Sequence, residues 1–131
     1  MSLLPPVWLI TGCSSGFGAS LALCALRAGH KVIATSRTPS KTPNLVSEVE
    51  KLGGTWRTLD VCSPDVPSII EEAVEVYGRI DYLVNNAGYA LLGAFEDMRY
   101  VGYLSCLVSW VSIILFQFLS ISISTLLMST P

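Results

Sequence analysis

The chain has 131 residues, of which 51% are hydrophobic and only 14% are charged, and its formal net charge is −2. The length predicts one domain. The charged fraction lies well below the roughly 25% of an ordinary soluble domain. Because the balance is slightly acidic and no basic cluster exists, a nucleic-acid-binding protein is disfavoured.

The charged residues are distributed unevenly. Every Lys, Arg, Asp and Glu lies at or before Arg99, and the stretch from Tyr100 to Pro131 contains no ionisable acid or base apart from Tyr and Cys. We therefore divide the chain into residues 1–98, an ordinary amphipathic segment, and residues 99–131, an apolar C-terminal tail.

The cysteines and the N-terminus give little sign of a metal site or an export signal. The four cysteines form no C-x-x-C pair, and His30 is the only histidine, so we predict no zinc site. No Lys or Arg precedes Arg27, so the basic start of a secretory signal is missing. We predict a cytoplasmic location with reduced thiols.

The first strand and helix follow directly from the pattern. Residues 7–10 are short, continuously apolar and partly β-branched, as in a strand buried on both faces. After a glycine-containing turn, apolar residues recur at helical spacing. Gly29 is expected to end this helix in a left-handed conformation. The residues at helical spacing are Phe17, Leu21, Cys24, Ala25 and Ala28.

The pattern then repeats. Residues 31–36 predict a second strand and residues 55–59 a third. Between them a short helix is expected to end at Gly53-Gly54. Its apolar face would consist of Leu45, Val46, Val49 and Leu52.

A third helix and a fourth strand complete the segment. Ser63, Pro64 and Asp65 predict an N-cap, a first-turn proline and an acid that suits the helix dipole. Gly78 is expected to end the helix, and residues 81–84 predict a strand. The expected inward residues are Val66, Ile69, Ile70, Ala73 and Tyr77, and the outward ones Glu71, Glu72 and Glu75.

Four strands alternating with three helices predict an α/β fold with a parallel sheet and right-handed crossovers. Ligands of such sheets bind at the carboxyl ends of the strands, where the strand order reverses. The candidate sites are the turn after the first strand, Ser36-Arg37 after the second and Asp60-Val61 after the third.

The turn after the first strand has the sequence Thr11-Gly12-Cys13-Ser14-Ser15-Gly16-Phe17-Gly18. Gly12 permits a tight turn, Gly16 lets the backbone approach a pyrophosphate, and Gly18 lets the helix pack closely on the strand. The helix N-terminus then offers unpaired N–H groups to the anion. A purely structural loop would also use glycines, but a strand–turn–helix context favours dinucleotide binding.

With Asp60 and Asn85-Asn86-Ala87-Gly88 after the third and fourth strands, this T-G-x-x-x-G-x-G turn resembles the short-chain dehydrogenase/reductase family. The resemblance covers Val7 to about Met98 and implies a Rossmann-type, doubly wound parallel sheet, incomplete here. It implies that the Gly-rich turn holds the cofactor pyrophosphate, that Asp60 contacts the adenine and that the Asn-Asn-Ala-Gly segment borders the nucleoside and supports the sheet. Alternatively, Asp60 caps a loop and Asn85-Asn86 forms an Asx turn. The expected cofactor-binding residues are Gly12, Ser14, Ser15, Gly16, Phe17, Gly18, Ser36, Arg37, Asp60, Val61, Asn86, Ala87 and Gly88.

The end of the second strand indicates which cofactor is used. NAD-binding folds place a carboxylate there for the ribose 2′-hydroxyl, and that carboxylate would repel the 2′-phosphate of NADP. Here the position is Ser36, and the guanidinium of Arg37 follows. Arg37 can bind a phosphate bidentately, so we predict NADP(H) rather than NAD, the alternative being an idle surface charge.

The family's catalytic residues have no counterpart here. The resemblance implies a Ser and a Tyr-x-x-x-Lys pair, in which the Lys lowers the Tyr pKa for proton transfer. The only lysines are Lys31, Lys41 and Lys51, and none follows a Tyr by four residues. We therefore assign no catalytic residue and no metal ligand.

Three interpretations of residues 99–131 stay open. The uncharged run exceeds the roughly 20 residues of a membrane helix, whereas the alternation from Ser120 to Ser124 is typical of a strand. The third is that the tail was never selected to fold. Our hypothesis for this third case is a translated intron, because Arg99-Tyr100-Val101 can be encoded by AGG-TAC-GTN, which contains a donor-like junction.

The sequence thus resembles the cofactor-binding half of an oxidoreductase that exchanges hydride between NADP(H) and a carbonyl or secondary alcohol, in a form that lacks the catalytic residues. The alternative is a non-catalytic nucleotide-binding or membrane-anchored interaction module. The expected partners are the dinucleotide and, in the full-length family, a small carbonyl or alcohol substrate. The sequence specifies neither that substrate nor an oligomeric state.

Overall fold

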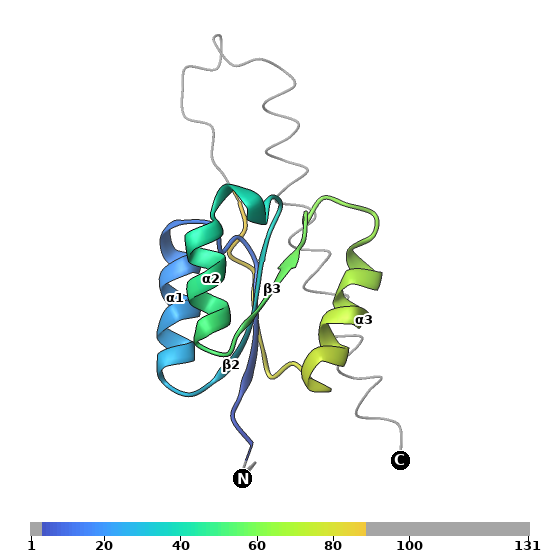
Figure 1. The fold of residues 1–131 in the computed structure, drawn as a ribbon. Coiled ribbons are helices and arrows are strands. Elements are labelled where there is room, and N and C mark those ends of the chain that lie inside the picture. Colours follow the sequence, from blue (N-terminus) through green and yellow to red (C-terminus); the bar gives the residue numbers. More distant parts are fainter. Residues whose placement is uncertain (1–3, 89–131) are drawn as a thin grey trace, which may run out of the picture. The chain divides into compact units, whose positions relative to one another are not determined.

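The structure, a computed structural model, describes residues 4–88. Strands alternate with helices along the chain, which confirms the predicted fold class (Figure 1). The elements are β1 (Val7–Ile10), α1 (Gly16–Arg27), β2 (Lys31–Ser36), the 3₁₀ turn η1 (Pro39–Lys41), α2 (Pro43–Lys51), β3 (Thr55–Thr58), α3 (Val66–Tyr77) and β4 (Tyr82–Val84). Contacts divide the chain into two units, Met1–Ala87 and Gly88–Pro131, and the fold below is that of the first.

The four strands form one parallel sheet in the order β3-β2-β1-β4. From β1 the chain moves outward to β2 and β3 and then returns to the other side of β1 for β4. Ile10, the last residue of β1, is paired with Ala34 on one side and Val84 on the other. The strand order therefore reverses between β1 and β4, and the loops that follow these two strands are neighbours.

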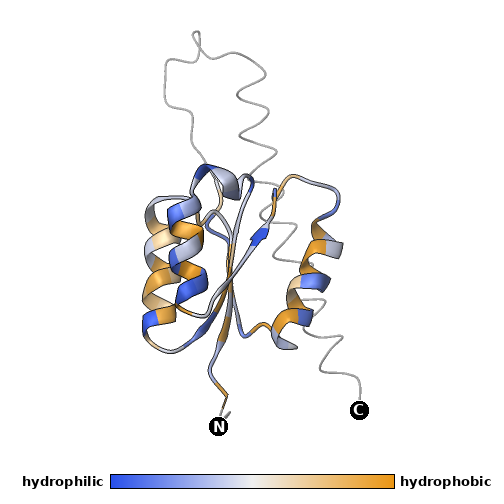
Figure 2. Cartoon of the chain, in the orientation of Figure 1, coloured by the Kyte–Doolittle hydropathy of each residue, from blue (hydrophilic) through white to orange (hydrophobic). Residues whose placement is uncertain are grey.

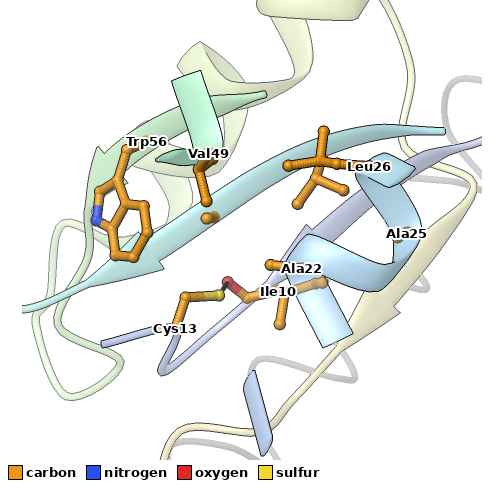
Figure 3. Packing of buried hydrophobic residues seen from close by; sticks show 9 residues of the cluster. Ile10, Cys13, Ala22, Ala25, Leu26, Val49 and Trp56 are labelled. Carbon is orange, nitrogen blue, oxygen red and sulfur yellow. Dashed lines mark hydrogen bonds between the residues drawn. The ribbon is translucent and has the colours of Figure 1, made fainter. Parts of the chain in front are cut away.

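Helices α1 and α2 cover one face of the sheet, and α3 lies on the opposite face (Figure 1). Helices α2 and α3 carry both hydrophobic and hydrophilic residues, as amphipathic helices do, whereas α1 is hydrophobic along most of its length (Figure 2). The main core cluster lies under α1 and α2 and draws residues from three strands, both helices and the Gly-rich turn (Figure 3). Its members are Ile10, Cys13, Ala22, Ala25, Leu26, Val32, Ala34, Val49 and Trp56.

The buried side of α1 differs from the residues that stand out in the sequence. Phe17 is 73% exposed, and Cys24 and Ala28 are exposed as well. The buried residues are Gly18, Ala22, Ala25 and Leu26. Of the residues named from helical spacing, Ala25 is therefore buried as expected, whereas Gly18 is buried where the helix backbone lies close to the Gly-rich turn.

The start of α3 also differs from the prediction. The helix begins at Val66 with Asp65 as its N-cap, and Pro67 is the proline of its first turn. Ser63 lies outside the helix, where its Oγ accepts a hydrogen bond from the Asp65 N–H at 3.2 Å. Serine offers the backbone this local alternative to capping, so the chain makes a turn before the helix starts. Gly78 ends the helix with φ +75°, as predicted.

The edge of the sheet opposite the predicted site is held by charged groups. Asp81 accepts a hydrogen bond from the Val7 N–H at 2.8 Å and forms an ion pair of 3.0 Å with Arg79. Because Asp81 N–H in turn donates to the Val7 carbonyl at 2.9 Å, the starts of β1 and β4 are joined by two hydrogen bonds. These contacts lie at the amino ends of the strands, whereas the loops with the candidate site residues lie at the carboxyl ends.

Candidate dinucleotide-binding site

The turn between β1 and α1 depends on two glycines with left-handed backbone. Gly12 has φ +69°, and a Cβ built there would lie 2.8 Å from the Cα of Ala87. Gly16 has φ +58°, and a Cβ there would meet nothing within 4 Å. Gly12 is therefore required by both backbone conformation and close packing, whereas Gly16 borders open space.

The N-terminus of α1 is not capped by a side chain. Ser15, the N-cap residue, has extended backbone and makes no side-chain capping hydrogen bond, and the first turn contains no acidic residue. The first N–H groups of an α-helix have no partner within the helix, and the helix dipole adds partial positive charge there. This end of α1, next to the open position at Gly16, is suited to an anion. Phe17 and Ser15 are exposed beside it, and Ser14 is half-buried.

Gly18 lies where α1, the turn and the loop after β4 meet. A Cβ built on Gly18 would collide with the side-chain nitrogen of Asn86 and would lie 2.5 Å from the carbonyl oxygen of Gly12. Real Cβ atoms do not approach that closely. Glycine at this position therefore allows the close approach of helix and strand that the sequence predicts.

Thr11 and Asn86 join the loops that follow β1 and β4. The buried Oγ1 of Thr11 accepts hydrogen bonds from the backbone N–H of Asn86 at 3.1 Å and of Ala87 at 3.0 Å. The side-chain amide of Asn86 donates to the carbonyls of Thr11 at 3.0 Å and Gly12 at 3.1 Å. These four hydrogen bonds cross the point where the strand order reverses. They hold the Gly-rich turn in place, while contact of Asn86, Ala87 or Gly88 with a nucleoside stays a prediction.

Asn85, the residue before this network, carries a buried side-chain oxygen. Its Oδ1 atom is buried and accepts no hydrogen bond from the residues that the structure describes. Buried acceptors without a partner are rare in native structures. Asn85 therefore offers a polar atom at the reversal point that a further group could pair.

Cys13 connects the Gly-rich turn to β2. Its N–H donates to the Thr35 carbonyl at 2.9 Å, and its Sγ donates to the Ile10 carbonyl at 3.2 Å. Burial raises the pKa of the Cys13 thiol from 9.0 to about 11, although a backbone hydrogen bond with Thr35 acts in the opposite direction. The thiol is thus protonated near neutral pH and serves as a tether rather than a nucleophile.

The ends of β2 and β3 carry the other predicted residues. Ser36 is only 5% exposed, and its Oγ accepts a hydrogen bond from Trp56 Nε1 at 3.1 Å. Arg37 is exposed and forms no hydrogen bond or ion pair with the residues at 4–88. Asp60 is exposed too, and its Oδ1 accepts from the Cys62 N–H at 3.0 Å, which is the turn-capping role given above as its alternative. Val61 is half-buried.

The predicted residues therefore form a contacting group and two flanking positions. Gly12, Gly18, Asn86 and Ala87 meet directly, and Ser36-Arg37 and Asp60-Val61 lie at the carboxyl ends of the neighbouring strands β2 and β3. Sequence reasoning did not include Thr11 or Trp56 among the site residues. Thr11 is the first residue of the T-G-x-x-x-G-x-G pattern, which was an available signal, whereas no local pattern marks Trp56 as a partner of Ser36.

The predicted tail, residues 99–131, lies outside the described residues, and so does any membrane segment in it. Within residues 4–88 no helix is both long and apolar enough to cross a bilayer.

Comparison with solved structures supports the fold. A 3-ketoacyl-(acyl-carrier-protein) reductase from Brucella melitensis, solved as a complex with NADH, superposes with a TM-score of 0.79 at 26% identity, over 91% of this chain and 49% of that chain. A short-chain dehydrogenase from Streptomyces avermitilis superposes with a TM-score of 0.75 at 34% identity, over 88% and 43%.

Comparison with curated proteins points the same way. Oxidoreductase claN of Passalora fulva is 52% identical over 91 residues, which cover 69% of this chain and 41% of that protein. Oxidoreductase BOA17 of Botryotinia fuckeliana is 42% identical over 93 residues, covering 70% and 34%. The chain thus spans less than half the length of these relatives. Residues 6–107 match the family described as short chain dehydrogenase, so this chain belongs to the short-chain dehydrogenase family.

Proposed function

We propose that this chain binds NADP(H) at the carboxyl edge of its sheet, as the cofactor-binding part of an oxidoreductase. The observation that carries the choice of cofactor is the pair at the end of β2. At the position where NAD-binding folds carry a carboxylate, this chain has Ser36. The next residue, Arg37, is exposed, and its guanidinium has no partner among the described residues. A 2′-phosphate would neutralise this cation, whereas NAD offers it only a hydroxyl.

The Gly-rich turn supports the placement of the rest of the cofactor. The N-terminus of α1 lacks a capping side chain and an acidic first turn, and Gly16 leaves open space beside it. These features fit a pyrophosphate, which the backbone N–H groups of Ser15, Gly16 and Phe17 would bind. Asp60 keeps one carboxylate oxygen free of the turn hydrogen bond and is assigned to the adenine, as the family resemblance implies.

The bound cofactor would supply a hydride for exchange with a carbonyl or secondary alcohol. The role of the described residues is to bind and orient it, because Thr11, Asn86 and Cys13 fix the turn relative to β2 and β4. The 131 residues include no Tyr followed by Lys at the fourth position. We therefore propose binding without turnover for this sequence, with residues 1–98 as the nucleotide-binding segment and the cytoplasm as its location.

The test is a titration of the purified chain with NADPH and NADH, before and after Arg37→Glu. Loss of one charge-assisted phosphate contact and reversal of the charge should weaken NADPH binding by roughly 10- to 100-fold. NADH binding should change by less than about threefold. Equal losses for the two nucleotides would overturn the assignment to NADP(H).

Lys51→Glu is the matched control. It makes the same change of charge at an exposed residue, in the last turn of α2, which points to the opposite edge of the sheet. Both nucleotides should then bind as they do to the unchanged chain. A loss equal to that of Arg37→Glu would show that net charge, rather than a contact at residue 37, governs binding.

A further inference from the structure

Trp56 and Ser36 form a buried polar pair in the core beside the candidate site. The indole Nε1–H donates to Ser36 Oγ at 3.1 Å, with Trp56 7% and Ser36 5% exposed. A buried indole N–H and a buried hydroxyl each need a partner, so the pair satisfies both groups. Losing either member would leave a polar group unpaired in the core.

The direction of the Ser36 side chain follows from the strand. Ser36 alternates with Val32 and Ala34, whose side chains belong to the core cluster under α1 and α2. Trp56 belongs to the same cluster as Cys13 of the Gly-rich turn (Figure 3). The Ser36 hydroxyl is thus directed into the core, toward the indole.

The position of Arg37 depends on Ser36. Residue 37 is the first residue beyond β2 and lies in a bend of the backbone. The carbonyl of Ser36 accepts a hydrogen bond from the Leu59 N–H at 2.9 Å, and its side chain is held by Trp56. Both attachments come from β3 and the residue that follows it, so β3 fixes the point from which the Arg37 side chain extends.

We propose that Trp56 is a positioning residue for cofactor selectivity, and that Ser36 acts as its anchor instead of touching the cofactor. This inference rests on the proposed function, since it assigns Arg37 to the 2′-phosphate. It replaces the direct cofactor contact that the sequence suggests for Ser36 with a structural one. The indole aligns the end of β2, and Arg37 alone presents the charge that distinguishes NADP(H) from NAD(H).

Two conservative variants cut the same hydrogen bond from its two sides. Trp56→Phe keeps an aromatic ring but removes the N–H, and Ser36→Ala removes the acceptor. Each should weaken NADPH binding about 3- to 10-fold, which corresponds to one lost hydrogen bond, and should leave NADH binding within about twofold. The double variant should be no weaker than either single one, because the same interaction is lost. In an Arg37→Ala background both variants should lose their effect on NADPH.

Tyr77→Phe is the matched control. The Tyr77 hydroxyl also bonds to β3, at Thr55 over 3.1 Å, but at the amino end of the strand. Removing it takes one polar group from an aromatic ring without touching the end of β2. NADPH and NADH binding should both stay unchanged.

The outcomes separate the inference from the proposed function. Binding of neither nucleotide by the unchanged chain would refute the proposed function and this inference with it. Unchanged NADPH affinity in Trp56→Phe would refute the inference alone. So would a loss in Ser36→Ala that adds to that of Trp56→Phe, since Ser36 would then act on the cofactor directly. A second readout needs no nucleotide: Ser36→Ala should shift the NMR resonance of the Trp56 indole N–H and speed its hydrogen exchange, and an unchanged indole signal would also contradict the pairing.

Discussion

Replacing Gly18 with Ala tests the close approach of α1 to the loops at the reversal point. Helix propensity alone would favour alanine by about 1 kcal/mol, because Gly18 lies within α1. The added Cβ, however, would collide with the Asn86 side-chain nitrogen and would lie 2.5 Å from the Gly12 carbonyl oxygen. The two effects predict opposite signs for the change in stability.

The magnitude follows from the groups that must move. Overpacking costs roughly 1–3 kcal/mol. Displacing the Asn86 amide weakens its hydrogen bonds to Thr11 and Gly12, each worth about 0.5–1.5 kcal/mol. After subtraction of the propensity gain, Gly18→Ala should lower the free energy of unfolding by about 1–5 kcal/mol. That is a large part of the total for a small domain.

Urea unfolding followed by tryptophan fluorescence measures this change. Ser20→Ala provides the control, because Ser20 is an exposed residue of the same helix. Its free energy of unfolding should stay within about 0.5 kcal/mol of the unchanged chain. A Gly18→Ala chain as stable as Ser20→Ala, or more stable, would refute the close packing of α1 on Gly12 and Asn86.

Three further outcomes follow from the site. Thr11→Val keeps the side-chain shape but removes the acceptor for two backbone N–H groups, so unfolding in urea should become easier by about 1–3 kcal/mol, and an unchanged midpoint would contradict the network. Iodoacetamide at pH 8 should label the exposed Cys24 and Cys62 in the folded chain well before the buried Cys13, as read by peptide mass mapping, and equal labelling would show that Cys13 is accessible. Burial raises the pKa of Cys13 from 9.0 to about 11, so the folded state holds the thiol proton more tightly than the unfolded state. The contribution of this proton to the free energy of unfolding is therefore complete below pH 9 and should decrease by up to about 2–3 kcal/mol as the pH rises to 11. In Cys13→Ala this part of the pH dependence should disappear, and a slope that persists would assign it to other groups.

Local patterns were sufficient for most of the fold. The bounds of β1 and β2, the end of α3 at Gly78 and the glycine turn follow from short apolar runs and left-handed glycines, which are properties of a few adjacent residues. The rules for parallel sheets predicted a reversal of strand order, but the loops after β1 and β4 are identified as neighbours by the observed strand order.

Features that depend on tertiary packing could not be predicted from local sequence patterns. At Gly18 of α1, Gly12 and Asn86 lie so close that they leave no room for a side chain. Likewise, Ser36 pairs with Trp56 across two strands, and nothing in the sequence near either residue indicates this contact. In both cases the decisive partner is distant along the chain.

The most direct test of cofactor binding is a titration of the ¹⁵N-labelled 131-residue chain with NADPH, followed by amide chemical shifts. Binding at the carboxyl edge should give saturable shifts at Ser15, Gly16 and Phe17, where the α1 N-terminus meets the anion, and at Arg37. The amides of Gly53 and Tyr77, at the opposite edge of the sheet, should stay unchanged. Absence of saturable shifts, or shifts confined to that opposite edge, would contradict a dinucleotide site at the Gly-rich turn.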